Sequence, residues 1–397
     1  MTRIHPVIRL KPKTRPQAIR DGFPWVYDNE LVTDRRTRAL ARGSLAVLED
    51  AGRAALGLVA VNPASRIMAR VLDSDPAAVI DQAWFAQRLA QAEGLRTRLY
   101  DAPYYRLIHA EADGLPGVVI DRFDDTAVIQ PNAAWAEQHL EDLTAALLAT
   151  TDVRNVLKNA SGRARALEGL DDRGGLLAGA APAGAVEVPM NGAIYLADLV
   201  GGQKTGLFYD QRPNHAFAAC LARDARVLDV FSHVGGFALA TLAGGARSAL
   251  AVDGSDAALT LARVGADRTG HGAGFDTRQG DAFAVMAGLA DAGETFDLVI
   301  CDPPAFAPSR KALEPGLRAY EKTARLAASL VGEGGFLCLC SCSHAAGLDS
   351  FRKASLRGIS RAGRAGLLIH TGGAGPDHPL HPHLAASGYL KALFFRL

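Results

Sequence analysis

The sequence predicts an α/β protein that ends in a Rossmann-like domain, preceded by a small β-barrel domain and a central α+β domain. Beyond residue 190, strand-like segments such as RVLDVF, SALAVD and FDLVICD alternate with helix-like segments such as DAALTLARVGAD. This alternation predicts a parallel sheet covered by helices on both faces, with a ligand beyond the carboxyl ends of its strands. Near the start, short segments such as SLAVLED and AALGLVAV are separated by glycine and proline, which favours a small barrel.

The central part of the chain combines helical and strand-like patterns. Apolar residues recur at helical spacing over residues 82–100, and VVIDRF, TAVIQ and RNVLKN alternate as strands around a second predicted helix at 133–149. Residues 174–185, GGLLAGAAPAGA, are so rich in glycine and alanine that they predict a linker. We therefore expect three domains, which comprise residues 1–75, 76–185 and 186–397.

Composition and cysteine usage argue against a secreted or membrane protein. The chain is 49% hydrophobic, but its N-terminus has no signal-like apolar run. No apolar stretch reaches the roughly 18 residues that a membrane helix requires. Three of the five cysteines crowd into CLCSC at 338–342, where no disulfide framework can form. Reduced thiols and a cytoplasmic location are therefore expected, with no membrane partner.

Charge is unevenly distributed along the chain, although the net charge is only +1. Lys11, Lys13 and Arg15 belong to a basic segment that precedes the first acidic residue, Asp21. Contacts with nucleic-acid phosphates need only local positive charge, so this segment is a candidate RNA-binding surface. The alternative is a solvated basic segment that binds nothing.

A nucleoside site is predicted after the first strand of the Rossmann-like domain. This strand, RVLDVF, leads into the turn SHVGGF, where Gly235 and Gly236 allow the backbone to approach a ligand closely. The second strand ends in Asp253, 18 residues after Gly235, at the spacing of a carboxylate that binds both ribose hydroxyls. No dinucleotide fingerprint and no phosphate-binding P-loop motif are present. S-adenosylmethionine, which has a ribose and no phosphate, fits this pattern.

Other residues at the ends of the same strands complete the expected cofactor site. Asp229 could face the methionine ammonium group, and Phe231 ends the strand that carries it. Asp281, after the third strand, could accept a hydrogen bond from the adenine amino group. The alternative for Asp281 is a helix N-cap, because a helical pattern follows it, and the two roles can coexist.

The fourth strand and its neighbour carry the candidate catalytic groups. Asp302 follows the strand FDLVI and precedes two prolines, which favours a rigid active-site edge. Cys342 ends the next strand at the same edge of the sheet. Methylation of carbon 5 of cytosine requires a thiolate to add to carbon 6, with an acid at the ring, so Cys342 and Asp302 are the expected pair. Cys301, Cys338 and Cys340 are expected in the core, and the C-x-C spacing predicts no metal site.

Several long phrases of the sequence resemble one family. They are GFPWVYDNEL, YRLIHAEADGLPGVVIDRF, GGQKTGLFYDQR, LDVFSHVGGF, CDPPAF, CSCS, DHP at 377–379 and GYLK. The chain resembles the PUA-domain-containing large-subunit (23S-type) rRNA cytosine-5 methyltransferases. The resemblance implies a PUA domain, a central α+β domain and a class I S-adenosylmethionine-dependent methyltransferase domain, with large-subunit rRNA as the substrate. It also implies that Cys342 is the nucleophile, and that the cofactor pocket is lined or braced by Lys204, Asp210, Gln211 and Arg212.

One position departs from this resemblance. Many RNA cytosine-5 methyltransferases carry a second cysteine after the proline of the acid motif, where this chain has Pro304. A product-releasing cysteine therefore has no candidate, and the base that removes the carbon-5 proton stays open, with His344 as one candidate.

The target base is expected to be extruded and to stack on Phe306 or Tyr209, unless these aromatic residues belong to the core. The oligomeric state is open, with a homodimer as one alternative.

Three other functions compete with this interpretation. The D-P-P motif is also typical of methyltransferases that act on amino groups, so guanine methylation is the first alternative, although Ala305 stands where an aromatic residue is usual. A non-catalytic RNA-binding ribosome assembly factor is the second, and acids at every expected strand end argue against it. A nicotinamide-dependent oxidoreductase is disfavoured by the missing dinucleotide fingerprint.

Overall fold

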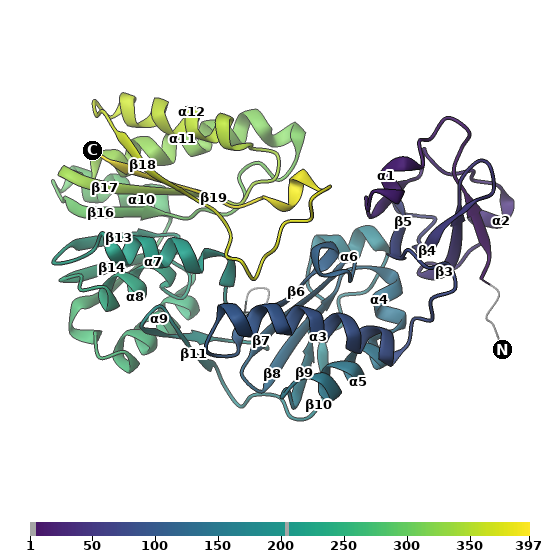
Figure 1. The fold of residues 1–397 in the computed structure, drawn as a ribbon. Helices are drawn as coiled ribbons and strands as arrows, with labels where there is room; N and C mark the ends of the chain where they lie inside the picture. The colour runs from purple at the N-terminus through teal and green to yellow at the C-terminus, as the bar shows by residue number, and fades with distance from the viewer. Residues whose placement is uncertain (1–4, 203–205) are drawn as a thin grey trace. The chain divides into compact units, whose positions relative to one another are not determined.

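A computed structural model describes residues 5–202 and 206–397, which form two compact units (Figure 1). The first unit contains the chain up to Ala183, together with Asp377–Ala385 and a short segment that begins at Leu199. The second contains Gly184–Asp198, Gly206–Pro376 and Ala386–Leu397. The domain boundaries expected at residues 75 and 185 stay predictions. None of the helices in the described part of the chain has the length and apolar content needed to span a bilayer.

The first unit begins with a five-stranded sheet in the order β1-β3-β4-β5-β2. Its strands are β1 (Val7–Arg9), β2 (Trp25–Tyr27), β3 (Ser44–Glu49), β4 (Ala55–Val61) and β5 (Ile67–Asp73), with the short helices α1 (Gln17–Arg20) and α2 (Arg35–Arg38). The β1–β3 pair is parallel and the other neighbouring pairs are antiparallel. Because successive side chains of a strand point to opposite faces, residues such as Ile8, Leu48 and Met68 are brought into one buried cluster. This small sheet therefore has its own core.

A second five-stranded sheet, in the order β10-β9-β8-β7-β6, lies in the same unit. Its strands are β6 (Tyr104–His109), β7 (Val118–Phe123), β8 (Thr126–Pro131), β9 (Asn155–Lys158) and β10 (Gly175–Ala178). Its helices are α3 (Gln82–Leu99), α4 (Ala134–Gln138), α5 (Leu140–Thr150) and α6 (Arg163–Glu168). Phe85 of α3 and Trp135 of α4 stack at 6.0 Å between ring centroids in the core of this part.

Two expectations for this region were wrong. The single helix expected at 133–149 is divided into α4 and α5, because His139 leaves the helical backbone conformation and its ring packs 6.3 Å from that of Trp135. The segment expected to be a linker contains β10, which pairs with β9 in antiparallel fashion. Leu177 and Ala178 pack against the core of this part, and this burial outweighs the flexibility of the surrounding glycines.

The second unit contains a seven-stranded sheet in the order β15-β14-β13-β16-β17-β19-β18. Its strands are β13 (Arg226–Val230), β14 (Ser248–Asp253), β15 (Phe275–Gln279), β16 (Phe296–Cys301), β17 (Val331–Ser341), β18 (Leu367–Gly372) and β19 (Lys391–Arg396), and a separate hairpin consists of β11 (Val186–Met190) and β12 (Ala193–Ala197). Within the seven-stranded sheet, the strands from β13 to β17 are parallel. The prediction of a parallel sheet holds for these five strands and is wrong for the remaining two, because β19 lies antiparallel between β17 and β18.

Helices cover both faces of this sheet, as expected. Those in the second unit are α7 (Arg212–Cys220), α8 (Gly236–Ala243), α9 (Asp256–Arg268), α10 (Ala282–Asp291), α11 (Leu313–Ser329) and α12 (Leu348–Arg361). Helices α10, α11 and α12 lie on one face, and α7, α8 and α9 lie on the other (Figure 1). The predicted α/β class with a Rossmann-like domain is therefore confirmed, and the carboxyl ends of β13, β14, β16 and β17 meet at one edge.

Candidate active site

The turn between β13 and α8 is shaped for close approach of a ligand. Phe231, His233 and Gly235 have positive φ angles of 64°, 50° and 78°, so the chain reverses tightly before α8 begins. A side chain at Gly236 would place its Cβ 2.8 Å from Nε2 of His215, which leaves no room for any residue larger than glycine. The two glycines of the predicted turn are thus required by backbone conformation at Gly235 and by packing at Gly236.

Asp229, near the end of β13, has the features expected of a cation site. The side chain is fully buried, and its Oδ2 accepts a hydrogen bond of 2.9 Å from the backbone N–H of Ala238. Its Oδ1 is also buried and has no hydrogen-bond partner among the described residues. Burial raises the pKa of Asp229 to about 7, because the loss of hydration outweighs the backbone hydrogen bonds from Ala238 and Phe237, and the charge of Asp253 adds to the rise. An ammonium group at Oδ1 would supply the missing partner, so the residue fits the methionine end of S-adenosylmethionine.

Asp253 is the last residue of β14, and Asp281 follows β15. Oδ2 of Asp253 accepts from the backbone N–H of His233 at 2.9 Å, and Oδ1 accepts from that of Ser255 at 2.8 Å, so the carboxylate is fixed beside the β13 turn. Each carboxylate oxygen has a further lone pair that a ribose hydroxyl could use. Asp281 is exposed and caps α10 through a bond of 2.9 Å from the N–H of Ala284 to Oδ1. The capping role is therefore present, and it leaves Oδ2 for an adenine amino group.

An aromatic cluster near these carboxylates includes one residue that sequence reasoning missed. The rings of Phe231, Phe283 and Phe306 lie pairwise 6.2 to 6.3 Å apart between centroids, and all three are only partly buried. Phe283 stands two positions after Asp281 in the first turn of α10, and this proximity to a predicted cofactor acid was the available signal. The cluster offers an apolar surface against which a purine could pack.

The acidic turn after β16 is held by a chain of amide contacts. Nε2 of Gln211 donates to Oδ2 of Asp302 at 2.8 Å, and Oε1 of Gln211 accepts from Nδ2 of Asn214 at 2.6 Å. Gln211 and Asn214 are both buried, so these bonds fix the orientation of the Asp302 carboxyl group. Asn214 was not predicted, although its place three residues after Gln211 at the start of α7 puts the two on one side of the helix.

The other residues implied by the resemblance have different environments. Asp210 accepts a hydrogen bond from the hydroxyl of Tyr389, and its Oδ1 is buried. The Arg212 guanidinium lies 5.4 Å from the ring centroid of Tyr209. Tyr209 itself is only 1% exposed, so it belongs to the core and is not a platform for an extruded base. Lys204 lies outside the described residues.

Cys342 differs from the other cysteines of the sheet in its exposure. It follows the last residue of β17 and is partly exposed, whereas Cys301, Cys338 and Cys340 are completely buried, as expected for core residues. Burial raises the pKa of each of these three thiols, which therefore stay protonated. In the register of the two strands Cys301 pairs with Leu339, so Asp302 and Cys342 lie at the same edge.

Two serines on either side of Cys342 attach it to the acidic turn. The hydroxyl of Tyr320 contacts Oγ of Ser343 at 2.7 Å and Oγ of Ser341 at 2.9 Å, and Ser343 Oγ also accepts from the backbone N–H of Ala307 at 2.9 Å. All of these side chains are buried. Sequence reasoning missed this brace, which ties β17, α11 and the loop after Asp302 together.

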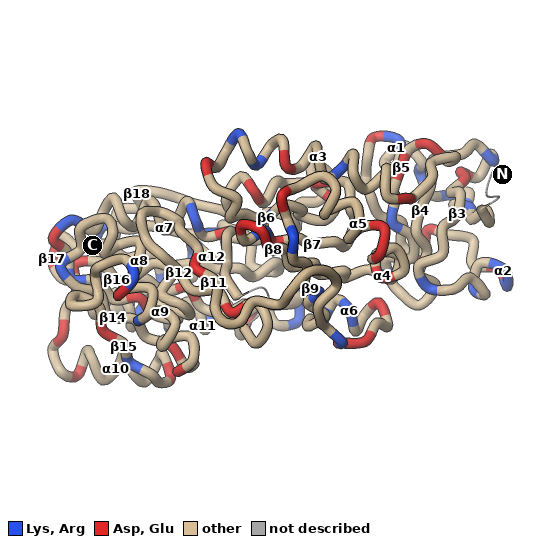
Figure 2. The backbone as a smooth tube through the Cα atoms, turned by 90° about the horizontal axis from the view of Figure 1, so that it is seen from below, with Lys and Arg blue, Asp and Glu red and all other residues tan. Residues whose placement is uncertain are grey.

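The predicted RNA-binding residues lie in the loop between β1 and α1 in the first unit. Lys11, Lys13 and Arg15 are all exposed, and Nζ of Lys11 donates to the backbone carbonyl of Asn29 at 2.9 Å. The helix α2 adds three further exposed arginines that the sequence reasoning did not single out. Figure 2 shows lysine and arginine positions in blue along the backbone tube, including those of α2.

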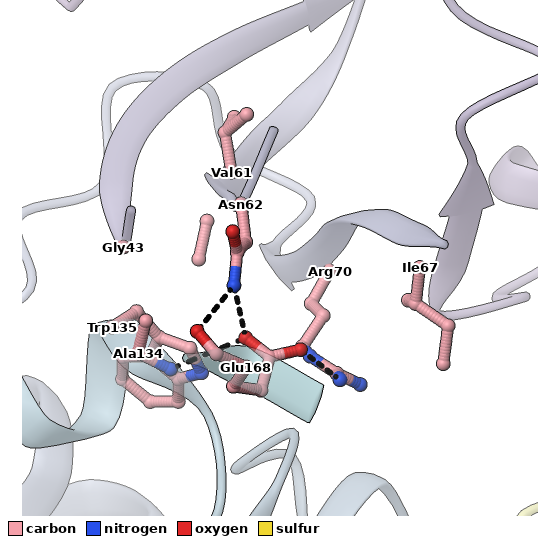
Figure 3. A pocket seen from close by; sticks show the side chains of 9 residues that line it. Gly43, Val61, Asn62, Ile67, Arg70, Ala134, Trp135 and Glu168 are labelled. Atoms are coloured by element: carbon pink, nitrogen blue, oxygen red, sulfur yellow. Dashed lines mark hydrogen bonds and ion pairs between the residues drawn. The ribbon is translucent and has the colours of Figure 1, made fainter. Parts of the chain in front are cut away.

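A small pocket in the first unit is a structural contact rather than a binding site. Its polar lining consists of Asn62, Arg70 and Glu168, which bind one another (Figure 3). Nδ2 of Asn62 donates to Oε2 of Glu168 at 2.8 Å, and the Arg70 guanidinium pairs with Oε1 at 3.0 Å. These groups satisfy each other and join α6 to the strands β4 and β5. Within the described ranges, no group of histidines, cysteines and acids is arranged to hold a metal.

The strand order of the second unit, together with the nucleoside turn at the end of β13, defines a Rossmann-like methyltransferase. Residues 107–396 match the S-adenosylmethionine-dependent methyltransferase family, and residues 8–74 match a PUA-like domain. The chain therefore belongs to the S-adenosylmethionine-dependent methyltransferase family, and the predicted cofactor is confirmed. The PUA-like domain expected at the amino-terminal end is confirmed as well.

Similar proteins match almost the whole chain. The ribosomal RNA large subunit methyltransferase I of Cronobacter sakazakii is 33% identical over 383 residues, which cover 96% of each chain. The protein of that name from Aliivibrio fischeri is 34% identical over 393 residues, 97% of this chain and 98% of the relative. A solved structure of a SAM-dependent methyltransferase from Streptococcus mutans has a TM-score of 0.83 at 17% identity, covers 99% of this chain and 100% of its own, and shows that the fold is shared.

Proposed function

We propose that this protein transfers a methyl group from S-adenosylmethionine to carbon 5 of a cytosine in large-subunit rRNA, with Cys342 as a covalent nucleophile. The observation that carries the proposal is the exposure of Cys342 beside the Asp302 turn, while the other cysteines of the sheet are buried. The substrate class follows from the relatives, which are named ribosomal RNA large subunit methyltransferase I and cover almost all of this chain.

The chemistry assigns one role to each side chain. The Cys342 thiolate adds to carbon 6 of cytosine, which breaks the double bond between carbons 5 and 6 and places an electron pair at carbon 5. Asp302, held by Gln211, supplies a proton to the ring nitrogen as this addition occurs. The cofactor supplies an electrophilic methyl group, which carbon 5 takes up. A base then removes the carbon-5 proton, the double bond reforms as the Cys342 thiolate leaves, and the ring nitrogen returns its proton to Asp302. His344, two residues after Cys342, is the candidate base.

The cofactor-binding residues are assigned to three parts of S-adenosylmethionine. Asp229 binds the methionine ammonium group through its unpartnered oxygen, and Asp253 binds the ribose hydroxyls. Asp281 accepts from the adenine amino group, with Phe231 among the apolar contacts and Gly235 and Gly236 providing the close approach. Asp210, Gln211 and Arg212 line or brace this pocket.

The PUA-like domain is assigned to the RNA backbone. Lys11, Lys13 and Arg15 are exposed and can contact phosphates, whereas the nearby Arg9 and Arg20 are paired with Glu49 and Asp50. Phosphate contacts contribute affinity without selecting a base, so the choice of cytosine falls to the pocket around Cys342. The target base must leave its stack to reach this pocket, and Phe306 is the remaining candidate to stack against it.

The test is identification of the methylated nucleoside. The purified protein, Cys342→Ala and the control Cys220→Ala are incubated with labelled S-adenosylmethionine and unmodified large-subunit rRNA, and the nucleosides are analysed by mass spectrometry. Cys220 is exposed on α7 and has no assigned role, so its replacement is expected to leave 5-methylcytidine formation unchanged. Cys342→Ala is expected to form none. Label on guanine, or label that survives Cys342→Ala, would overturn the cysteine mechanism, and absence of label with every RNA would favour a non-catalytic assembly factor.

A further inference from the structure

Lys391 is a buried lysine beside the proposed nucleophile. It is the first residue of β19, lies opposite Ser341 of β17 in the antiparallel register, and is only 7% exposed. Its Nζ donates a hydrogen bond of 2.7 Å to the backbone carbonyl of Ser343, the residue after Cys342. The ammonium group is therefore held at the end of β17, on the backbone of the residue that follows Cys342.

Such a position is costly for a cation, because burial removes its hydration. Burial lowers the pKa of Lys391 to about 8, and the charge of Cys342 acts in the opposite direction and favours the ammonium form. The lysine is thus still mainly protonated at neutral pH. Since an ammonium group has three N–H donors and Ser343 uses one, two remain for other acceptors.

Among the described residues, three other titratable groups near Cys342 are Tyr320, Asp302 and His344. Tyr320 of α11 faces Cys342, and burial raises the pKa of this phenol, which stays neutral. Asp302, at the end of the neighbouring strand β16, carries no positive charge whether it is protonated or ionised. His344 is on the same loop as Cys342 and is the candidate base under the proposed function.

We propose that Lys391 is a positioning residue that keeps Cys342 as a thiolate, by placing a buried ammonium group beside it and fixing the backbone at Ser343. The inference rests on the proposed role of Cys342 as the nucleophile. A thiolate is both the reactive form of cysteine and the form that a neighbouring cation stabilises. The lysine comes from the antiparallel strand β19, which an all-parallel sheet would not contain.

The test measures the thiol itself and needs no RNA. The parent protein carries Cys220→Ser, so that Cys342 is the accessible cysteine among the described ones, and its alkylation by iodoacetamide is followed against pH by mass spectrometry. Lys391→Met keeps the length of the side chain and removes the charge, whereas Lys391→Arg keeps the charge. Lys353→Met, at an exposed site on α12, is the matched control.

We expect Lys391→Met to move the midpoint of alkylation upward by about one to three pH units, the usual effect of an opposite charge within a few ångströms. The rate at pH 7 should fall about tenfold or more, while Lys391→Arg and Lys353→Met keep most of the parent profile. An unchanged profile in a folded Lys391→Met protein would overturn the proposal.

A second measurement covers the case in which Lys391→Met does not fold. If alkylation of the parent protein has its midpoint at or above the ordinary cysteine value of about 8.5, the thiolate is not stabilised and the proposal fails. Failure of the proposed function appears differently, because a product other than 5-methylcytidine would leave the dependence of alkylation on Lys391 intact.

Discussion

Replacing Asp229 by asparagine should stabilise the cofactor-free protein at alkaline pH and weaken cofactor binding at the same time. The pKa of Asp229 is raised from 3.8 to about 7 in the folded protein, so the folded state disfavours the charged form. Stability is therefore lost as pH rises from the unfolded pKa to the folded one, and the loss is complete above about pH 7. A difference of about 3 pKa units corresponds to about 4 kcal/mol.

Asparagine has no charge to bury, so Asp229→Asn lacks this pH-dependent loss. Between pH 5 and pH 8, the free energy of unfolding of the wild type should fall relative to that of the variant by about 2 to 3 kcal/mol. Any constant cost of the amide cancels in this comparison. The assay is calorimetric unfolding of both proteins without cofactor at the two pH values, with Asp276→Asn as the control, because the Asp276 side chain is 79% exposed.

The same substitution should weaken S-adenosylmethionine binding about 10- to 150-fold in titration calorimetry, since it removes a charged hydrogen-bond acceptor. Parallel pH profiles for the wild type and Asp229→Asn would refute the burial argument. Unchanged cofactor affinity would refute the assignment of the ammonium group to this carboxylate. The two halves of the prediction can therefore fail separately.

Two further perturbations test the remaining parts of the account. The double variant Lys11→Glu/Lys13→Glu should weaken RNA binding and lower the slope of log affinity against log salt by about 2, one for each phosphate that a lysine no longer neutralises, with unchanged cofactor affinity in titration calorimetry. Equal RNA affinity for wild type and variant would remove this surface from the account. Gly236→Ala should lose about 1 to 3 kcal/mol of stability in denaturant unfolding and should bind the cofactor poorly. The reason is that its Cβ would lie 2.8 Å from Nε2 of His215. A variant as stable as the wild type would contradict the tight packing of the turn.

The strand ends of the Rossmann-like domain could be predicted from the sequence because they depend on local pattern. Each buried strand is followed by an acid, a glycine turn or a cysteine, and the carboxyl ends of parallel strands meet at one edge. Asp229, Asp253, Asp302 and Cys342 were placed in this way, and the structure puts them at the ends of β13, β14, β16 and β17. The strands β3 and β4 likewise fall within the segments SLAVLED and AALGLVAV that the sequence pattern marks, whereas the short helices α1 and α2 were not predicted.

The residues that support this site could not be predicted, because they depend on contacts distant in sequence. Lys391 reaches the backbone of Ser343, beside Cys342, because β19 inserts antiparallel between β17 and β18, a pairing that strand and helix alternation does not specify. Tyr320 has the period of a buried helix face, and nothing local marks its hydroxyl as the partner of Ser341 and Ser343. The division of the helix at His139 likewise depends on tertiary packing.

The central claim is that Cys342 forms a covalent bond with the target cytosine, and trapping that bond tests it most directly. An rRNA fragment that contains 5-fluorocytidine is incubated with the protein and S-adenosylmethionine, and the adduct is digested and mapped by mass spectrometry. A base can remove a proton from carbon 5 but cannot remove fluorine. The elimination step is therefore blocked after methyl transfer, and the protein should stay attached to the RNA. The account predicts an RNA-linked peptide that carries the modification on Cys342; methylation of unmodified rRNA without any such adduct, or an adduct on another residue, would contradict it.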